Sequence, residues 1–158
     1  MILSSCKFVR FENSQPVDAK ELATFPKNMI GEYIGQENDT LIVKSKSYKN
    51  GKEKEEYLSP GKIVLKKFKS YYVLNYYEEE NWDVFLLKLT GKNLTVYAID
   101  FEKEEEKVIN DLKKILPVIE YNAEGNSKSY VINPTKREFK LLVKKNQFKP
   151  IGTYTRIK

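Results

Sequence analysis

Short apolar runs separated by turn signals dominate residues 29–100. The seven predicted strands are residues 29–35, 40–48, 54–59, 62–69, 71–77, 82–89 and 94–100. Asn50-Gly51 and Pro60-Gly61 stand between strands and suit the backbone angles of tight turns. Because every connection is short, the pattern predicts an antiparallel meander in which neighbouring strands pair.

One of these strands differs from the rest in its pattern. In residues 62–69 and 93–100 apolar and polar side chains alternate, which indicates strands with one covered face. Residues 82–89, Trp-Asp-Val-Phe-Leu-Leu-Lys-Leu, are apolar on both faces. We therefore expect this strand to be covered on both sides, by a helix or by the N-terminal segment.

After Asp100 the apolar spacing changes to that of a helix. Val108, Ile109 and Leu112 fall on one stripe, glutamates precede them, and Pro117 follows the last turn. Acidic residues near a helix N-terminus complement the helix dipole, and Asp100 is a suitable N-cap. The pattern predicts a first amphipathic helix ending before Pro117.

A second amphipathic helix is predicted near the C-terminus. Asn133 or Thr135 can cap it, Phe139 and Leu142 lie on its apolar stripe, and Asn146 suits a left-handed C-terminal position. Further strands are predicted at residues 118–122, 128–132 and 148–158. The fold class is thus mainly β (α+β), an antiparallel meander forming a barrel or half-barrel, with two amphipathic helices in the C-terminal half.

Composition limits the chemistry that the chain can perform. Its 158 residues fit one domain, and it contains no histidine and one cysteine. These counts exclude an intramolecular disulfide, a Ser/His/Asp triad and the commonest ligand of zinc, copper and haem sites. We expect no metal site, no cofactor and no enzymatic activity.

The net charge of +6 raises the question of an anionic partner. Of the 28 basic residues 25 are lysine, whereas recognition of bases and phosphates favours the planar guanidinium of arginine. The high lysine, asparagine and tyrosine content is typical of a compositional bias. The charge pattern therefore does not favour nucleic acid as the partner.

Residues 3–6, Leu-Ser-Ser-Cys, resemble a bacterial lipobox, a leucine and two small residues before the cysteine that is acylated. The resemblance implies that Cys6 is a lipid attachment site and that the partner is a membrane. It also implies a true start upstream of Met1 and a location in the cell envelope; otherwise the location is cytoplasmic. Residues 1–25 lack sustained periodicity and are predicted to be a lipobox remnant and flexible tether.

A second resemblance concerns the body of the protein. Gly31-Glu32-Tyr33 followed by a Leu-x-Val strand resembles the opening of lipocalin-like barrels, and Gly152-Thr153-Tyr154 repeats the Gly-x-Tyr form on the last strand. The resemblance implies a single lipocalin-like β-barrel domain over residues 26–158. It also implies that the last strand lies beside the first.

Aromatic side chains with polar tips are the candidate ligand contacts in such a barrel. The predicted set is Tyr33, Tyr72, Tyr76, Trp82 and Tyr97. The leading hypothesis is a non-enzymatic, lipid-anchored binding protein of the cell envelope. Its ligand would be a small molecule, a glycan or a protein.

Two alternatives remain open. Residues 66–77 interleave cations and aromatic rings, as in domains that bind single-stranded nucleic acid, so a cytoplasmic basic binding domain is the first. The second is a hydrolase that uses carboxylates alone. Its candidate residues are Glu78, Glu79, Glu80 and Asp83.

Overall fold

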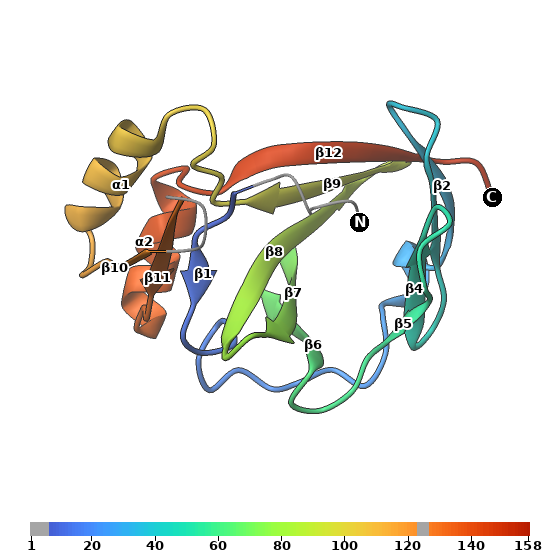
Figure 1. The fold of residues 1–158 in the computed structure, drawn as a ribbon. Coiled ribbons are helices and arrows are strands. Elements are labelled where there is room, and N and C mark those ends of the chain that lie inside the picture. Colours follow the sequence, from blue (N-terminus) through green and yellow to red (C-terminus); the bar gives the residue numbers. More distant parts are fainter. Residues whose placement is uncertain (1–6, 123–126) are drawn as a thin grey trace.

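A computed structural model describes residues 7–122 and 127–158, and these residues form a 12-stranded sheet that does not close (Figure 1). The strands are β1 (Arg10–Phe11), β2 (Gly31–Gly35), β3 (Thr40–Val43), β4 (Ser47–Asn50), β5 (Glu56–Tyr57), β6 (Ile63–Phe68), β7 (Tyr71–Glu78), β8 (Asn81–Thr90), β9 (Asn93–Ala98), β10 (Ile119–Asn122), β11 (Lys128–Ile132) and β12 (Lys149–Arg156). The helices are the 3-10 turn η1 (Lys27–Met29), α1 (Glu105–Lys113) and α2 (Lys136–Lys144). The predicted mainly β half-barrel with two helices in the C-terminal half is confirmed.

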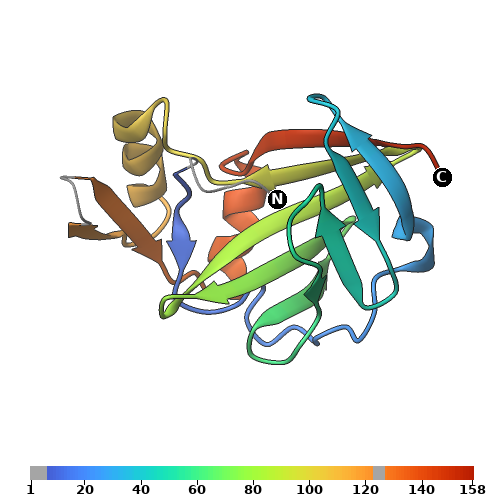
Figure 2. The ribbon, with the colours of Figure 1, turned by 45° about the vertical axis from the view of Figure 1, so that its right-hand side comes forward.

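Two antiparallel meanders make up the half-barrel. Strands β2 to β5 pair in sequence order, and so do β6 to β9. Figure 2 shows them as two curved layers. Strand β12 pairs with β9 along one edge and with β2 along the other, placing Arg156 opposite Tyr33. The predicted neighbourhood of the last strand and the first strand of the meander is confirmed.

The predicted strand at residues 40–48 is wrong in one respect, because it is a hairpin. Strands β3 and β4 pair antiparallel, with Val43 opposite Tyr48. The Lys44 N–H donates to the Ser47 carbonyl at 2.8 Å, and residues 44–46 are all exposed. Three consecutive polar residues allow the chain to turn in solvent, whereas a continued strand would carry them along the sheet.

Strand β8 separates two apolar cores, as its two-sided pattern predicts. Alternate residues face opposite ways, so Val84 and Leu86 enter one core while Phe85 and Leu87 enter the other. The helix-side core includes Phe11, Leu112, Tyr130, Phe139, Leu142 and Phe148. The barrel-side core includes Phe25, Met29, Tyr33, Tyr48, Leu65, Leu74 and Tyr154.

The two helices cover the helix-side core but are capped differently. In α2, Thr135 Oγ1 accepts from the Glu138 N–H at 3.1 Å, and Glu138 Oε1 accepts from the Thr135 N–H at 2.9 Å. Of the two predicted caps, Thr135 is therefore the one used. The predicted Asp100 cap of α1 is wrong, because that helix begins only at Glu105. Phe101 is only 2% exposed and packs in the core, and the helix begins after it.

The N-terminal segment corrects the predicted domain boundary at residue 26. Strand β1 pairs in parallel with β11 and meets β8 at Trp82, and Phe11 is fully buried. The tether prediction is therefore wrong for residues 7–25, which belong to the folded body. Residues 1–6, including Cys6, lie outside the described residues.

Residues 12–25, here the N-terminal strap, run along the lower edge of the half-barrel in Figure 1. The Leu22 N–H donates to the Leu65 carbonyl at 2.7 Å, and the Phe25 N–H donates to the Ser45 carbonyl at 2.8 Å. The strap thus bridges β6 of one meander and the β3–β4 turn of the other. It covers the gap that the sheet itself leaves between the two meanders.

Buried polar side chains fix the strap to the sheet. Asn75 Oδ1 accepts from the Gln15 N–H at 2.7 Å, and its Nδ2 donates to the Gln15 carbonyl at 2.9 Å. Lys66 Nζ donates to Ser14 Oγ and to the Pro16 carbonyl, both at 3.0 Å. These bonds satisfy strap groups that have no strand partner, as buried backbone requires.

Candidate functional site

A cleft of about 590 Å³ lies at the mouth of the half-barrel. Its walls come from β4 and β5 on one side and from the ends of β7 and β8 on the other, while residues 7–10 and 127–129 border it. The lining residues used below are Phe8, Arg10, Tyr48, Glu53, Glu56, Tyr76, Glu78, Glu79, Asp83 and Phe85. We call it the mouth cleft.

The floor of the mouth cleft is formed by aromatic residues at the edge of the barrel-side core. Phe8 and Phe85 meet edge to face with ring centroids 5.6 Å apart. Tyr48 is 9% exposed and Phe85 is 4% exposed, so both are wedged between the core and the cleft. Aromatic rings at the floor give a ligand an apolar surface in contact with the polar walls.

Below this floor the half-barrel is filled with side chains. A void of about 30 Å³ remains among apolar residues such as Met29, Leu74 and Leu94. That volume is far below the roughly 300 Å³ at which small-molecule sites begin. An organic ligand therefore has room in the mouth cleft and not in the interior.

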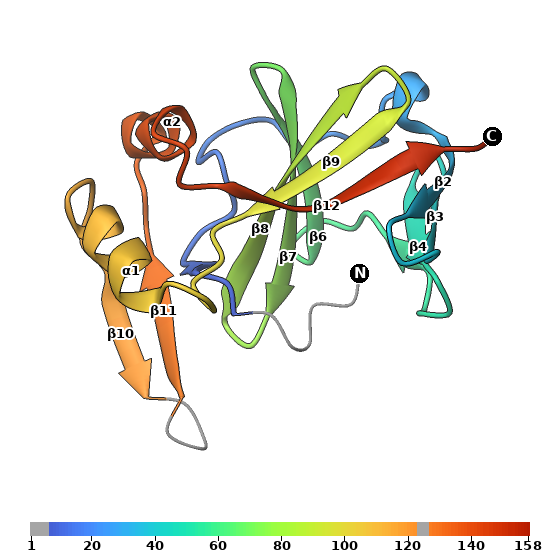
Figure 3. The ribbon, with the colours of Figure 1, turned by 90° about the horizontal axis from the view of Figure 1, so that it is seen from above.

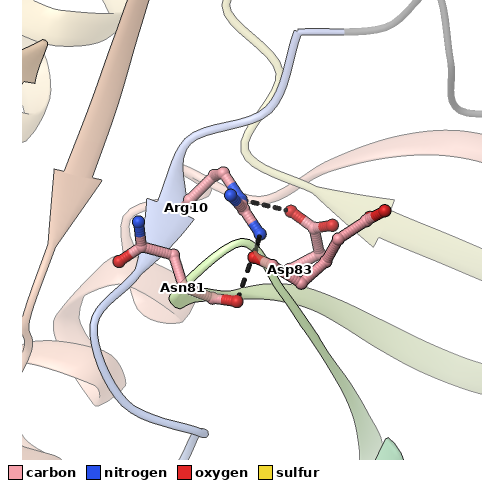
Figure 4. Close-up of polar contacts among 4 residues, drawn as sticks. Arg10, Asn81 and Asp83 are labelled. Carbon is pink, nitrogen blue, oxygen red and sulfur yellow. Dashed lines mark hydrogen bonds and ion pairs between the residues drawn. The ribbon is translucent and has the colours of Figure 1, made fainter. Parts of the chain in front are cut away.

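Arg10 organises one wall of the cleft (Figure 4). Its Nε lies 3.0 Å from Asp83 Oδ1, and its Nη2 donates to the Asn81 carbonyl at 3.1 Å and also to the Glu78 carbonyl. The side chains of Arg10 and Asp83 are only 17% and 24% exposed. The guanidinium therefore holds both the β7–β8 turn and the Asp83 carboxylate in place.

Carboxylates crowd around the tyrosines of the cleft. Burial, together with Glu56, Glu78 and Asp83, raises the pKa of Tyr76. Burial raises the pKa of Asp83, and Arg10 offsets part of that rise. In both groups burial is the largest cause of the raised pKa, and neighbouring carboxylates add to it.

The five aromatic residues predicted as ligand contacts do not gather around one cavity. Tyr76 lines the mouth cleft. Tyr33 is fully buried, and its hydroxyl donates to the Met29 carbonyl at 2.6 Å. Tyr72 packs against the barrel-side core, whereas Trp82 and Tyr97 pack against the helix-side core. Ligand contact stays a prediction for all five.

The predicted carboxylate cluster lies largely at the cleft. Glu78, Glu79 and Asp83 line it, and Glu80 belongs to the adjacent turn. Sequence reasoning missed Arg10 and Glu56, because each comes from a two-residue strand with no recognisable periodicity. One signal for Arg10 was present in the sequence, because this residue stands between Val9 and Phe11 in a chain with three arginines.

Comparison with known proteins found no matching family model, no matching curated protein and no matching solved structure. Within residues 7–122 and 127–158, no helix is long and apolar enough to cross a membrane. The same residues contain no group of three or more acidic or sulfur side chains arranged to hold a metal ion.

Proposed function

We propose that the protein is a non-enzymatic binding protein whose mouth cleft takes a small polar organic molecule. The observation that carries this proposal is the cleft of about 590 Å³, with an aromatic floor and charged walls. Its volume falls within the range of about 300–1,000 Å³ that small-molecule sites occupy. The cleft is also built from segments far apart in sequence, with Arg10 fixing one wall against Asp83.

The walls favour a polar ligand that carries both hydrogen-bond donors and acceptors. Five carboxylates, those of Glu53, Glu56, Glu78, Glu79 and Asp83, line the cleft together with the cations Lys7, Arg10, Lys54 and Lys128. An ionised carboxylate only accepts hydrogen bonds and a lysine ammonium only donates them, so hydroxyl groups, which do both, match these walls. A saccharide has this chemistry, and its carbon frame would lie on the aromatic floor, whereas an organic amine would match the carboxylates alone.

Amide chemical shifts measured with glucose, N-acetylglucosamine and spermidine at millimolar concentration test the proposal. We expect at least one probe to perturb amides of residues 8–10, 53–56 and 76–83 together. A response to the saccharides would identify hydroxyl groups as the groups that the cleft binds, and a response to spermidine would identify ammonium groups. Unchanged chemical shifts with all three probes, or shifts confined to another part of the surface, would contradict ligand binding in the mouth cleft.

A matched pair of variants sharpens this test. Tyr76→Phe removes a hydroxyl inside the cleft, and Tyr57→Phe removes one from an exposed position on β5, where the hydroxyl donates to Glu55 at 2.6 Å. The chemical change is the same in both. We expect only Tyr76→Phe to weaken the binding of a responding probe, by roughly tenfold for one lost hydrogen bond.

A carboxylate-only hydrolase remains the second candidate, favoured by the raised pKa of Asp83. In such an enzyme the general acid is a carboxyl group whose pKa is raised by its surroundings. Asp83, however, is bound at 3.0 Å by Arg10, which stabilises its ionised form. Release of nitrophenol from nitrophenyl glycosides that depends on Asp83 would favour the hydrolase over the binding protein.

Lipid attachment at Cys6 is a separate part of the proposal and rests on the Leu-Ser-Ser-Cys pattern. Lys7 borders the mouth cleft and its carbonyl accepts from the Phe101 N–H at 2.9 Å, so an anchor at Cys6 would have no spacer. The cleft would then open close to the membrane. We expect Cys6→Ser to abolish labelled fatty acid incorporation when the gene is expressed with its upstream region. Undiminished labelling in that variant would contradict attachment at Cys6.

A further inference from the structure

The segment that covers helix α2 and the residues after it is strongly basic. Residues 136–149 carry six cations and one carboxylate, a net charge of +5, whereas the whole chain carries +6. The six cations are Lys136, Arg137, Lys140, Lys144, Lys145 and Lys149. We call these six residues the basic stripe.

Helix α2 is held so that the basic stripe faces outward. Phe139 and Leu142 are both fully buried, and Phe139 meets Phe68 edge to face at 5.1 Å and Phe148 at 5.8 Å. The opposite side of the helix presents Arg137, Lys140 and Lys144. At 1.5 Å per residue these three span about 10 Å along the axis. Figure 3 shows α2 at the periphery of the molecule.

The basic stripe lacks internal neutralisation among the residues that the structure describes. All six cations are exposed, and none makes an ion pair with a described residue. The one carboxylate of the segment, Glu138, is used in the α2 capping box. The lysines of α1 differ, since Lys107 and Lys114 both pair with Asp111.

We infer that the basic stripe is a docking surface for the anionic headgroups of a lipid bilayer. Clusters of four to eight cations on an amphipathic helix are attracted to anionic lipid, by about 1 kcal/mol for each residue near the surface. Five of the six cations are lysines, whose compact ammonium groups suit diffuse attraction more than bidentate recognition of bases. The aromatic residues of the same segment, Phe139 and Phe148, are buried and offer no ring for base stacking.

Sedimentation with lipid vesicles tests this inference on the unacylated full chain. We expect binding to phosphatidylglycerol vesicles that weakens as salt rises to about 200 mM, and no binding to phosphatidylcholine vesicles. Arg137→Gln, Lys140→Gln and Lys144→Gln combined should weaken binding by about fivefold per charge, hence roughly 100-fold. The matched control combines Lys20→Gln, Lys52→Gln and Lys92→Gln, which removes the same charge from exposed positions elsewhere.

Several outcomes would overturn the inference. These are failure of the wild-type chain to bind anionic vesicles, equal binding to both kinds of vesicle, and an equal loss in the control variant. Tighter binding of single-stranded DNA than of anionic vesicles at the same salt would assign the stripe to nucleic acid instead. The salt titration uses the wild-type chain alone, so a folding defect in a variant cannot decide the result. Because the mouth cleft is not involved, Tyr76→Phe should bind vesicles like the wild type.

Discussion

Strand β8 separates two regions that are built from alternate residues of the same backbone. On the helix side Val84 and Leu86 are covered by β1, α1 and α2, and that face is closed. On the barrel side Phe85 and Leu87 lie in a filled core, but Asp83 faces the open mouth cleft. The difference lies in what covers each face. Where a distant segment seals the sheet the residues are apolar, and where no segment seals it they are charged.

The largest expected effect comes from a comparison of Phe11 with Phe8, which lie three residues apart but in differently covered regions. Phe11 is fully buried in the helix-side core and stacks on Phe148 at 6.1 Å, whereas Phe8 is half-buried at the mouth cleft. We expect Phe11→Ala to lower the free energy of unfolding by about 3–5 kcal/mol. Phe8→Ala should cost about 1–2 kcal/mol, since less apolar surface is lost.

Urea denaturation of the two variants provides the measurement. The slope of the free energy against urea concentration should stay similar, so that the midpoint reports the change in stability. A loss below about 1 kcal/mol in Phe11→Ala would show that residues 7–11 behave as a tether after all. Equal losses in both variants would remove the distinction between the closed face and the open one.

Asn75 and Tyr76 give the second test, as adjacent residues on opposite faces of β7. Asn75 is fully buried and binds both backbone groups of Gln15, while Tyr76 points into the mouth cleft. Asn75→Ala leaves a buried N–H and a buried carbonyl without partners, so we expect a loss of about 2–3 kcal/mol. Tyr76→Phe should change stability by less than about 0.5 kcal/mol.

Hydrogen exchange locates the effect of this substitution. If Asn75 fixes the N-terminal strap, amides of residues 12–25 should exchange faster in Asn75→Ala, while those of β12 should keep their protection. Uniform loss of protection over the whole sheet would mean that Asn75 supports the general fold and not the strap.

Local patterns in the sequence predicted the elements whose information is local. The Thr135 cap, the left-handed Asn146 (φ 56°) and the two-sided strand β8 all follow from residues within a few positions of each other. Strand β1 could not be predicted in this way. It has two residues, and its parallel partners Val131 and Ile132 lie about 120 residues away along the chain.

The mouth cleft was predictable only in part, for the same reason. Tyr76, Glu78, Glu79 and Asp83 come from one hairpin, and their closeness follows from the sequence. Their approach to Glu56 of β5 depends on how the two meanders curve toward each other. Strand β12 joins the two meanders, because it pairs with both β9 and β2, and these partners lie far away along the chain.

The third test concerns the charge pair that holds the open side of β8. Arg10→Gln removes the guanidinium from Asp83 and from the carbonyls of Glu78 and Asn81. We expect a loss of about 1–2 kcal/mol at neutral pH, because charged hydrogen bonds are lost in a half-buried site. In the wild-type chain the Arg10 guanidinium offsets part of the rise that burial causes in the pKa of Asp83. Without the guanidinium, the pKa of Asp83 should therefore be higher in the variant.

The pH dependence of this loss has a definite sign. The folded-state pKa of Asp83 lies above its ordinary value of 3.8, so this group contributes stability below pH 3.8 that is lost as pH rises through the folded-state pKa. In Arg10→Gln the folded-state pKa is higher still, and more stability is lost over a window that extends further upward. The gap between variant and wild type should therefore be small at about pH 3 and should widen toward about pH 7. Lys7→Gln, which removes an exposed cation at the same cleft, should leave the gap near zero at both pH values. A gap in Arg10→Gln that is equally large at both pH values would mean that the guanidinium acts through the two carbonyls and not through Asp83.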